Sequence, residues 1–208
     1  MDYIIDKGKR EKFSYRGNMM NVNEQIINAT IELFNEYGYK FRIDDITNKL
    51  FISKKTIYNI FGDKEQLFLE VLKYCGMAAK KEQEQIIQST ESDYADKVRH
   101  VLALWPDRFR RLNQKQLIAL KINSPQMAKK VGDYYRKEWE TVEELLSEAM
   151  IRGSIIRVPT KLIRSMLEGT LENFVLNNNN LENKISYEET KKNTIRIIMN
   201  GIELLELE

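Results

Sequence analysis

The residues best placed to do chemistry lie in a short basic stretch in the first third of the chain. Between Lys40 and Tyr58 there are five cations and two anions, a local net charge of +3, although the whole chain of 208 residues carries a formal net charge of only +2. The cations are Lys40, Arg42, Lys49, Lys54 and Lys55. A basic cluster on a compact unit favours a polyanionic partner. On charge alone, an ordinary solvated surface explains it equally well.

Composition gives little support to other kinds of chemistry. The single cysteine, Cys75, excludes a disulfide within the chain, and the single histidine, His100, argues against a structural zinc site or a Cys-His catalytic pair. No paired-carboxylate motif, glycine-rich phosphate loop or metal-ligand spacing is found. We therefore expect no enzyme, no cofactor and no metal site.

Membrane and export signals are not found either. The apolar runs are too short for a transmembrane helix, and charges flank Ile4 and Ile5 where a signal peptide needs an apolar core. Hydrophobic residues make up 42% of the chain, which is enough for a packed core, and only 3 Pro and 9 Gly leave room for long helices. These features predict a cytoplasmic helical protein with no membrane partner.

Apolar residues at helical spacing predict the helices that would hold the basic stretch. These helices span residues 23–37, 43–50, 54–61 and 64–75. Gly38 would end the first helix in a left-handed conformation, while Ser53 and Asp63 would cap the third and fourth. Two short helices joined by a tight turn and braced by their neighbours form a helix-turn-helix.

The rest of the chain also has the pattern of helices separated by breaks. Further helices are predicted at 77–89, 94–104, 107–121, 126–152, 160–176 and 188–206. Proline and glycine residues at Pro106, Pro125, Gly153 and Pro159 mark the breaks. No alternation typical of strands is present. The predicted fold class is all-α, with about nine helices in total.

The stretch from Ile26 to Leu72 resembles the DNA-binding domain of the TetR (tetracycline-repressor-like) family of bacterial transcription regulators. The resemblance rests on an ordered set of residues: Ala29, Leu33, Phe34, Gly38, Tyr39, Asp45, Ile46, Ile52 to Tyr58, Phe61, Lys64, Glu65 and Leu67. Two positions depart from the family pattern. Phe51 stands where the turn usually has glycine, and Lys55 where a small residue is usual. Phe51 must therefore tolerate a strained turn backbone or shift the turn.

The resemblance implies an organisation in three parts. Residues 1–20 would be a basic arm, residues 21–76 a three-helix DNA-binding head with its motif at about 42–61, and residues 77–208 an effector-binding and dimerisation domain. The arm is expected to be a tail rather than a reader of the minor groove, and Met19 or Met20 is an alternative start. The remaining two thirds of the chain match the family in layout only.

The implied function is a ligand-responsive DNA-binding regulator, with repression the expected sense. It would bind a palindromic operator in double-stranded DNA as a homodimer and be released by a small-molecule effector. The alternative is a helical structural or nucleoid-associated protein of the same fold without operator control. The identity of the effector does not follow from the sequence.

Side chains near the predicted third helix are the expected DNA contacts. They are Arg42, Thr47, Lys54, Lys55, Thr56, Tyr58, Asn59 and Lys64. Tyr58 matches a tyrosine that binds phosphate in the family, Asn59 would read a base, and Lys64 would bind phosphate at a helix N-terminus. Taken alone, Tyr58 fits a half-buried packing residue equally well. Ile57, Ile60 and Phe61 are expected to point to the core.

The resemblance also places an effector pocket among the central helices. Its expected residues are His100, Trp105, Phe109, Tyr134, Tyr135 and Trp139. Aromatic residues at helical spacing are more often ordinary core residues, so that alternative stays open. Arg108, Arg110 and Arg111 would suit an anionic ligand, but a solvated face is favoured for them.

The last two predicted helices carry more apolar surface than one monomer core needs. Gly169 and Gly201 would allow helices to approach closely, so two helices from each subunit could form a four-helix interface. The expected interface residues are Ile163, Met166, Leu167, Gly169, Phe174, Ile198, Gly201, Ile202 and Leu205. The alternative is an ordinary pair of core helices.

Overall fold

The computed structural model describes residues 21–90, 92–177 and 185–204. Over these residues the chain forms nine α-helices and two short 3-10 helices. They are α1 (Val22–Tyr37), η1 (Gly38–Lys40), α2 (Ile43–Leu50), α3 (Lys54–Phe61), α4 (Lys64–Gln88), α5 (Tyr94–Leu104), η2 (Pro106–Phe109), α6 (Gln114–Asn123), α7 (Pro125–Ile151), α8 (Thr160–Asn177) and α9 (Tyr187–Ile202). The predicted arm 1–20, Leu205 and the side chain of Arg108 lie outside the described part.

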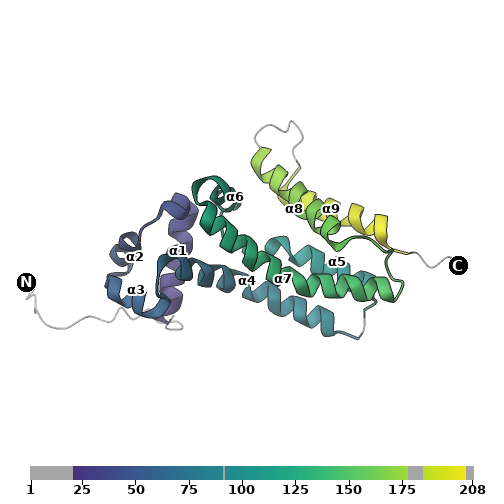
Figure 1. The fold of residues 1–208 in the computed structure, drawn as a ribbon, viewed down its shortest axis with the longest axis horizontal. Helices are drawn as coiled ribbons and strands as arrows, with labels where there is room; N and C mark the ends of the chain where they lie inside the picture. Colours follow the sequence, from purple (N-terminus) through teal and green to yellow (C-terminus); the bar gives the residue numbers. More distant parts are fainter. Residues whose placement is uncertain (1–20, 91, 178–184, 205–208) are drawn as a thin grey trace, which may run out of the picture.

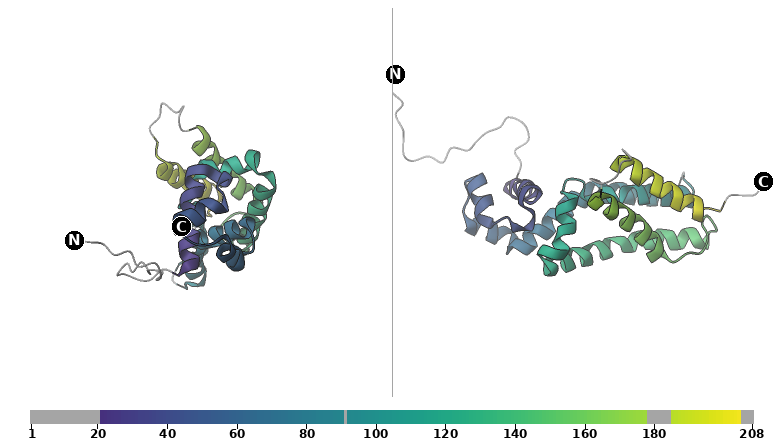
Figure 2. Two further views of the ribbon diagram at one scale, coloured as in Figure 1. Left: turned by 90° about the vertical axis from the view of Figure 1, so that its left-hand side faces the viewer. Right: turned by 90° about the horizontal axis from the view of Figure 1, so that it is seen from above.

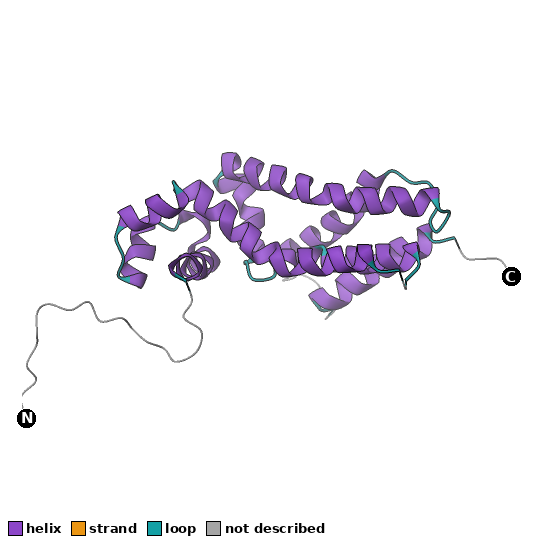
Figure 3. Cartoon of the chain, turned by 90° about the horizontal axis from the view of Figure 1, so that it is seen from below, coloured by secondary structure: helices purple, strands orange, loops and turns teal. Residues whose placement is uncertain are grey.

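The predicted all-α fold is confirmed. Helices α1 to α3 lie at one end of an elongated molecule, and α4 leads from them into a bundle with α5, α7, α8 and α9 (Figures 1 and 2). Within the described ranges there is no strand (Figure 3), only one isolated antiparallel bridge between Ile155 and Glu203. None of the helices described has the length and apolarity that a membrane span needs.

A hydrophobic core holds α1 to α4 together. The broad apolar face of α1 buries Ile26 and Phe34 completely, and Ile46 of α2, Ile57 of α3 and Phe68 of α4 are also at 0% exposure. Each such side chain contributes roughly 1.5–3 kcal/mol when it leaves water. The small unit formed by α1, α2, α3 and the first turns of α4, which we call the head, therefore has its own tightly packed centre.

The head is not closed off from the rest of the chain. Its hydrophobic cluster continues through Phe109, Leu120 and Val131, which belong to η2, α6 and α7. A second cluster joins α5, α7, α8 and α9, with Trp139 fully buried among them. We call the part formed by α5 to α9, η2 and the distal half of α4 the body. The division into domains at residue 76 remains a prediction.

The predicted helix break between residues 75 and 77 is wrong. It runs without interruption from Lys64 to Gln88, so one helix spans the head and the body. Gly76 does not end it, because Gly76 is buried where α4 crosses η2. A β-carbon there would lie 3.8 Å from the rings or hydroxyl of Phe109 and Tyr134. These are ordinary van der Waals distances, so Gly76 is an interior position of a continuous helix and not a helix end.

The predicted helix at 107–121 is also wrong. The chain forms η2, then an irregular stretch, and α6 begins only at Gln114 after its cap Asn113. Asn35 of α1 holds this stretch from both sides: its side-chain amide donates to the Arg111 carbonyl at 2.9 Å, and its side-chain oxygen accepts from the Asn113 N–H at 2.7 Å. The break is stabilised by a partner 76 residues away in sequence, so local spacing does not predict it.

Two helix ends differ from expectation in detail. Gly38 has the predicted positive φ of 61°, but its ψ of −155° is not left-handed helical, and η1 follows directly. Helix α9 ends at Ile202 instead of 206, because the chain turns into backbone hydrogen bonds with the segment before α8. There the Ile156 N–H donates to the Ile202 carbonyl at 2.7 Å.

Candidate DNA-binding surface and ligand pocket

Helix α3 presents one face to solvent and buries the other. Ser53 caps it by accepting from the Thr56 N–H at 3.1 Å, as predicted. Ile57 is completely buried and fixes the helix to the head, whereas Lys55, Tyr58 and Asn59 are exposed. The sequence prediction erred on Ile60, which is 39% exposed rather than in the core. With Ile57 as the anchor, the polar side chains of α3 share the outward face.

Two of the predicted contacts on this face already have partners. Lys54 forms an ion pair with Asp44 of α2 at 2.7 Å, and this carboxylate raises the Lys54 pKa. The Thr56 hydroxyl lies 2.9 Å from the Ser53 hydroxyl. Among the described residues Lys55 has no such pairing. Lys55 is therefore the cation of α3 most available to a phosphate.

Residues of α2 flank this surface. Arg42 precedes α2 and is exposed, and its N–H donates to the Asp45 carboxylate at 2.7 Å in a capping arrangement. Thr47 is half-buried, and its hydroxyl donates to the Asp44 carbonyl at 2.9 Å. Arg42 can thus reach outward freely, while Thr47 is partly committed to its own helix.

Lys64 is placed differently from the expectation. Its ammonium group donates to the Tyr39 carbonyl at 2.7 Å and lies 4.2 Å and 4.3 Å from the ring centres of Tyr39 and Phe41. Burial lowers the Lys64 pKa and raises that of Tyr39 to about 12. The structure therefore uses Lys64 to tie η1 to the start of α4 and does not present it as an exposed phosphate ligand.

The turn between α2 and α3 keeps the geometry usual for glycine. Phe51 adopts left-handed φ and ψ of 54° and 38°, the one non-glycine residue with positive φ in the described part of the chain. Its side chain is 95% exposed. Of the two alternatives, Phe51 thus tolerates the strained backbone and leaves the turn in place.

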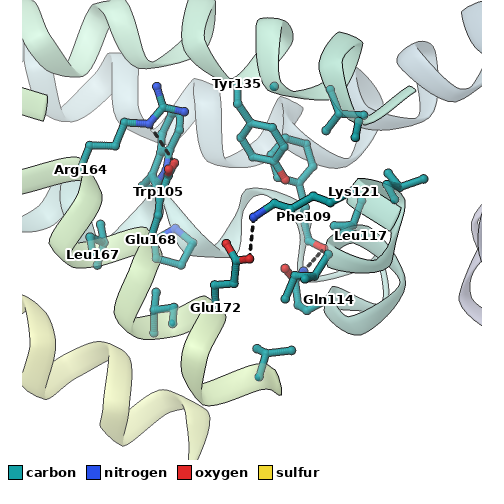
Figure 4. Close-up of a pocket in the computed structure, with 18 of the residues that line it drawn as sticks. Trp105, Phe109, Gln114, Leu117, Lys121, Tyr135, Arg164, Leu167, Glu168 and Glu172 are labelled. Atoms are coloured by element: carbon teal, nitrogen blue, oxygen red, sulfur yellow. Dashed lines mark hydrogen bonds and ion pairs between the residues drawn. The ribbon is translucent and has the colours of Figure 1, made fainter. Parts of the chain in front are cut away.

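A cavity of about 280 Å³ opens in the body beside the head (Figure 4). Apolar and aromatic side chains from η2, α6, α7 and α8 make most of its wall. The apolar and small residues are Trp105, Pro106, Phe109, Leu117, Ile118, Leu120, Ala128, Val131, Gly132, Tyr135, Leu167, Leu171, Val175 and Tyr187. Its polar residues are Gln114, Lys121, Arg164, Glu168 and Glu172. Such a concave, mainly apolar site with a few polar groups is typical of small-molecule binding.

The six predicted pocket residues divide into two groups. Trp105, Phe109 and Tyr135 line the cavity. Trp139 instead packs edge-on behind Trp105, with 4.7 Å between ring centres, and Tyr134 packs beside Phe109 at 6.3 Å. His100 is exposed on α5 with its Nδ1 2.8 Å from the Asp96 carbonyl, away from the cavity. Three of the six expected residues thus line a cavity near η2 and α7, and the last three do not. That this cavity binds an effector stays a prediction.

Sequence reasoning missed the charged wall on α8. Arg164, Glu168 and Glu172 are spaced four residues apart, so they share one face of a helix, a signal that was present in the sequence. The apolar pattern of this helix predicts an interface, but it does not show that a polar face of the same helix lines a cavity. Of the arginines for which a solvated face was favoured, Arg110 and Arg111 are exposed, and Arg111 donates to Asn28 of α1 at 2.8 Å.

The predicted interface residues are mostly internal. Ile163, Leu167, Phe174, Ile198 and Ile202 are buried in the chain's own core and do not form an exposed surface, contrary to the prediction. Helices α8 and α9 pack on each other and on α5, α6 and α7, so the faces that carry these residues are buried within the chain. Met166, Gly169 and Gly201 of the predicted set do lie on the outward faces. They are joined there by Leu162 and Leu176 on α8 and by Ile197 and Leu204 on or just after α9.

Comparison with known proteins gives consistent matches. Residues 26–71 match the family described as bacterial regulatory proteins, tetR family. The uncharacterized HTH-type transcriptional regulator YvaF of Bacillus subtilis (strain 168) is 23% identical over 181 residues, covering 87% of this chain and 95% of its own.

Solved structures share the fold. The fatty acid degradation regulator FadR from Bacillus halodurans superposes with a TM-score of 0.68 at 20% identity, covering 86% of this chain and 98% of that one. A putative transcriptional regulator from Saccharomonospora viridis in complex with choline gives a TM-score of 0.65 at 17% identity, covering 88% and 98%. The helix-turn-helix head therefore matches the N-terminal domain of the tetR family of bacterial regulatory proteins, and the chain shares its all-α fold with solved transcription regulators.

Proposed function

We propose that the chain is a ligand-responsive repressor that binds a palindromic operator as a homodimer and leaves it when a small molecule fills the cavity. The observation that carries this proposal is the double contact of α6. Its Leu117 and Lys121 line the cavity, while its Gln116 packs against Gly38 at the end of α1. A ligand that moves α6 would therefore move the head.

The connection from cavity to head is reinforced just before α6. Arg111 and Asn113, which link η2 to α6, are hydrogen-bonded to Asn28 and Asn35 of α1. The link therefore connects the cavity wall, formed in part by η2 and α6, to α1 of the head. A ligand needs to prefer the released conformation by only about 1.4 kcal/mol to weaken operator binding tenfold.

The proposed DNA surface is the outward face of α3 with its flanks. Lys55 and Tyr58 would bind phosphates and Asn59 would read a base edge, with Lys54, Thr56, Arg42 and Thr47 in supporting positions. Footprinting on the DNA upstream of the chain's own gene is the direct test. We expect a protected palindrome with half-sites about 34–36 Å apart, or slightly more. Protection without a symmetric sequence would contradict operator binding.

Specificity offers a second test of the surface. Asn59→Ala should relax the preference at one base pair per half-site, at a cost of about 1–3 kcal/mol. Selection of binding sites from random DNA measures this directly. If the variant and the wild type return the same consensus, Asn59 does not read a base.

The proposed dimer surface is the outward face of α8 and α9. It offers exposed apolar side chains at Leu162, Met166 and Ile197, with Gly169 between them in sequence. A β-carbon at Gly169 would meet nothing within 4 Å, so Gly169→Arg fits the monomer and would act only on association. An arginine there would bury an unpaired charge in the interface.

Sedimentation velocity and a DNA-shift assay test the dimer together. Gly169→Arg should sediment as a monomer and lose operator binding, while its thermal unfolding midpoint stays close to that of the wild type. Met77→Arg is the matched control, since Met77 is 61% exposed on α4, away from α8 and α9. A Gly169→Arg protein that remains dimeric and binds normally would put the interface elsewhere.

A further inference from the structure

We propose that the cavity takes an uncharged, mainly apolar ligand of small size, and that it discriminates against both anions and cations. This inference rests on the proposed function, in which the cavity is the effector site. The argument depends on how the four charged side chains in the cavity wall are already paired, and on what a ligand charge would meet there.

The inner charged groups, Arg164 and Glu168, are paired with each other. One oxygen of Glu168, Oε1, accepts from the Trp105 indole N–H at 3.0 Å and from Nε of Arg164 at 3.1 Å. The Arg164 guanidinium lies 5.9 Å and 5.5 Å from the ring centres of Trp105 and Trp139. Figure 4 shows Arg164, Glu168 and Trp105 together at the cavity wall. Because the two opposite charges are paired, the inner wall carries no net charge.

The second pair lies where α6 faces α8. Lys121 of α6 and Glu172 of α8 form an ion pair at 2.5 Å across the cavity, as the dashed line in Figure 4 marks. Lys121 is the more exposed partner, with 63% of its side chain accessible against 36% for Glu172. The pair thus sits at the outer edge of the cavity, and it balances its own charge.

A charged ligand would therefore gain little and lose much. An anion near Lys121 or Arg164 would also approach Glu172 or Glu168, and a cation would meet the same problem in reverse. Either would leave water and break or share an existing ion pair, which costs free energy unless a new partner compensates. A neutral ligand keeps both pairs and gains from the aromatic and aliphatic wall.

Tyr135 supplies a polar group that suits a neutral ligand. Its ring packs against Phe109 with 4.6 Å between centres, and its hydroxyl has no hydrogen-bond partner among the described residues. Burial raises the Tyr135 pKa, so the hydroxyl stays protonated and can donate to an uncharged oxygen or nitrogen. The cavity volume of about 280 Å³ is near the lower end for ligand pockets, which points to a compound of a few rings or a short chain.

Matched fluorescent probes test the charge preference. Phenylnaphthylamine is neutral, and anilinonaphthalene sulfonate has the same rings with a sulfonate; diphenylhexatriene is neutral, and its trimethylammonium derivative is the cationic counterpart. The chain has 2 tryptophans, one lining the cavity and one packed against the first, so quenching of their emission reports binding at this place. We expect each neutral probe to bind at least about tenfold more tightly than its charged partner.

Substitution of one member of the outer pair should change the preference predictably. Glu172→Gln leaves Lys121 unpaired and should raise the affinity for the sulfonate relative to its neutral partner by about tenfold. Lys121→Gln should favour the trimethylammonium probe in the same way. Glu148→Gln is the matched control, because Glu148 pairs with Arg152 on the surface of α7 and does not line the cavity. It should leave both ratios unchanged.

Gly132 allows the cavity itself to be blocked. It lines the cavity on α7, and a β-carbon there would meet nothing within 4 Å. We therefore choose Gly132→Phe to fill the cavity with a ring. We expect this variant to lose probe binding while it remains folded by circular dichroism. Gly132→Ala adds only a methyl group and should still bind the probes. It therefore distinguishes loss of binding by a filled cavity from loss of binding caused by substitution of Gly132 itself.

The outcomes distinguish the ligand class from the proposed function. Tighter binding of either charged probe by the wild type, or probe binding that survives Gly132→Phe, would overturn the neutral class. If neutral probes bind as expected but no cavity ligand alters DNA binding, the ligand class stands and the effector role fails. If no probe of any charge binds, both fail.

Discussion

The outward face of α3 and the cavity of the body differ in how their side chains are held. On α3, residues of a single eight-residue helix supply the surface, and Lys55, Tyr58 and Asn59 project from it without contributing to the core. The cavity draws on segments from Trp105 to Tyr187, and its polar residues hold one another in place. The residues of the α3 surface can be predicted from the local sequence and substituted with little effect on stability. The residues of the cavity wall cannot, because they come from distant segments and pair with one another.

Glu168 should show this difference most strongly. Glu168→Ala would leave the Trp105 indole and the partly buried Arg164 without their acceptor, so we expect the free energy of unfolding to fall by about 2–3 kcal/mol. Asn59→Ala, its counterpart on α3, should change it by less than about 0.5 kcal/mol. Urea denaturation measures both. Equal losses for the two variants would remove the contrast between the regions.

Two lysines of the head should behave in opposite ways. Lys64→Met removes an internal hydrogen bond and cation–π contacts, so we expect a loss of stability of about 1–2 kcal/mol and an unchanged salt slope of DNA binding. Lys55→Ala should keep the stability and lower that slope by roughly 0.9. Titrations of DNA binding at several salt concentrations measure the salt slope of each variant. A reduced slope for Lys64→Met would return Lys64 to the set of phosphate ligands.

Phe51 should be a position where the head can be made more stable. Its side chain is 95% exposed and its backbone is left-handed, so Phe51→Gly removes strain and little packing. We expect the free energy of unfolding to rise by about 0.5–1 kcal/mol, seen as a higher thermal midpoint. A lower midpoint would mean that the ring makes a stabilising contact in the folded protein.

Cys75 should give the smallest effect, confined to high pH. Burial raises its pKa from 9.0 to about 11, so the unfolded chain loses the thiol proton first as the pH rises. This contribution to stability is complete below pH 9 and is lost as the pH rises towards 11. The wild type should therefore lose more stability over this range than Cys75→Ser does. Parallel pH dependences would show that the thiol titrates normally.

The sequence predicted the helices of the head well because their signals are local. Ser53 and Asp63 cap α3 and α4 as expected, and Ile57 anchors α3 in the core. The predicted helix boundaries were wrong where a residue distant in the sequence determines the local structure. Asn35 holds the break before α6, and Gly76 sits at a crossing of two segments rather than at a helix end.

The candidate sites follow the same rule. Spacing could not show that Lys64 turns inward under the rings of Tyr39 and Phe41, because those rings arrive from η1 and the residue after it. Nor could it assign the two faces of α8, one of which is buried while the other lines the cavity with Glu168 and Glu172. An apolar pattern shows that a helix is buried, but not what covers it.

Binding of the selected palindrome and of a scrambled sequence of equal length, at one salt concentration, tests operator recognition by α3 most directly. The wild type should prefer the palindrome by at least about a thousandfold. The variant Lys55→Ala/Tyr58→Phe/Asn59→Ala should bind both sequences weakly and alike, with its unfolding midpoint and probe binding unchanged. Equal binding of both sequences by the wild type would contradict operator recognition and favour a structural, nucleoid-associated role.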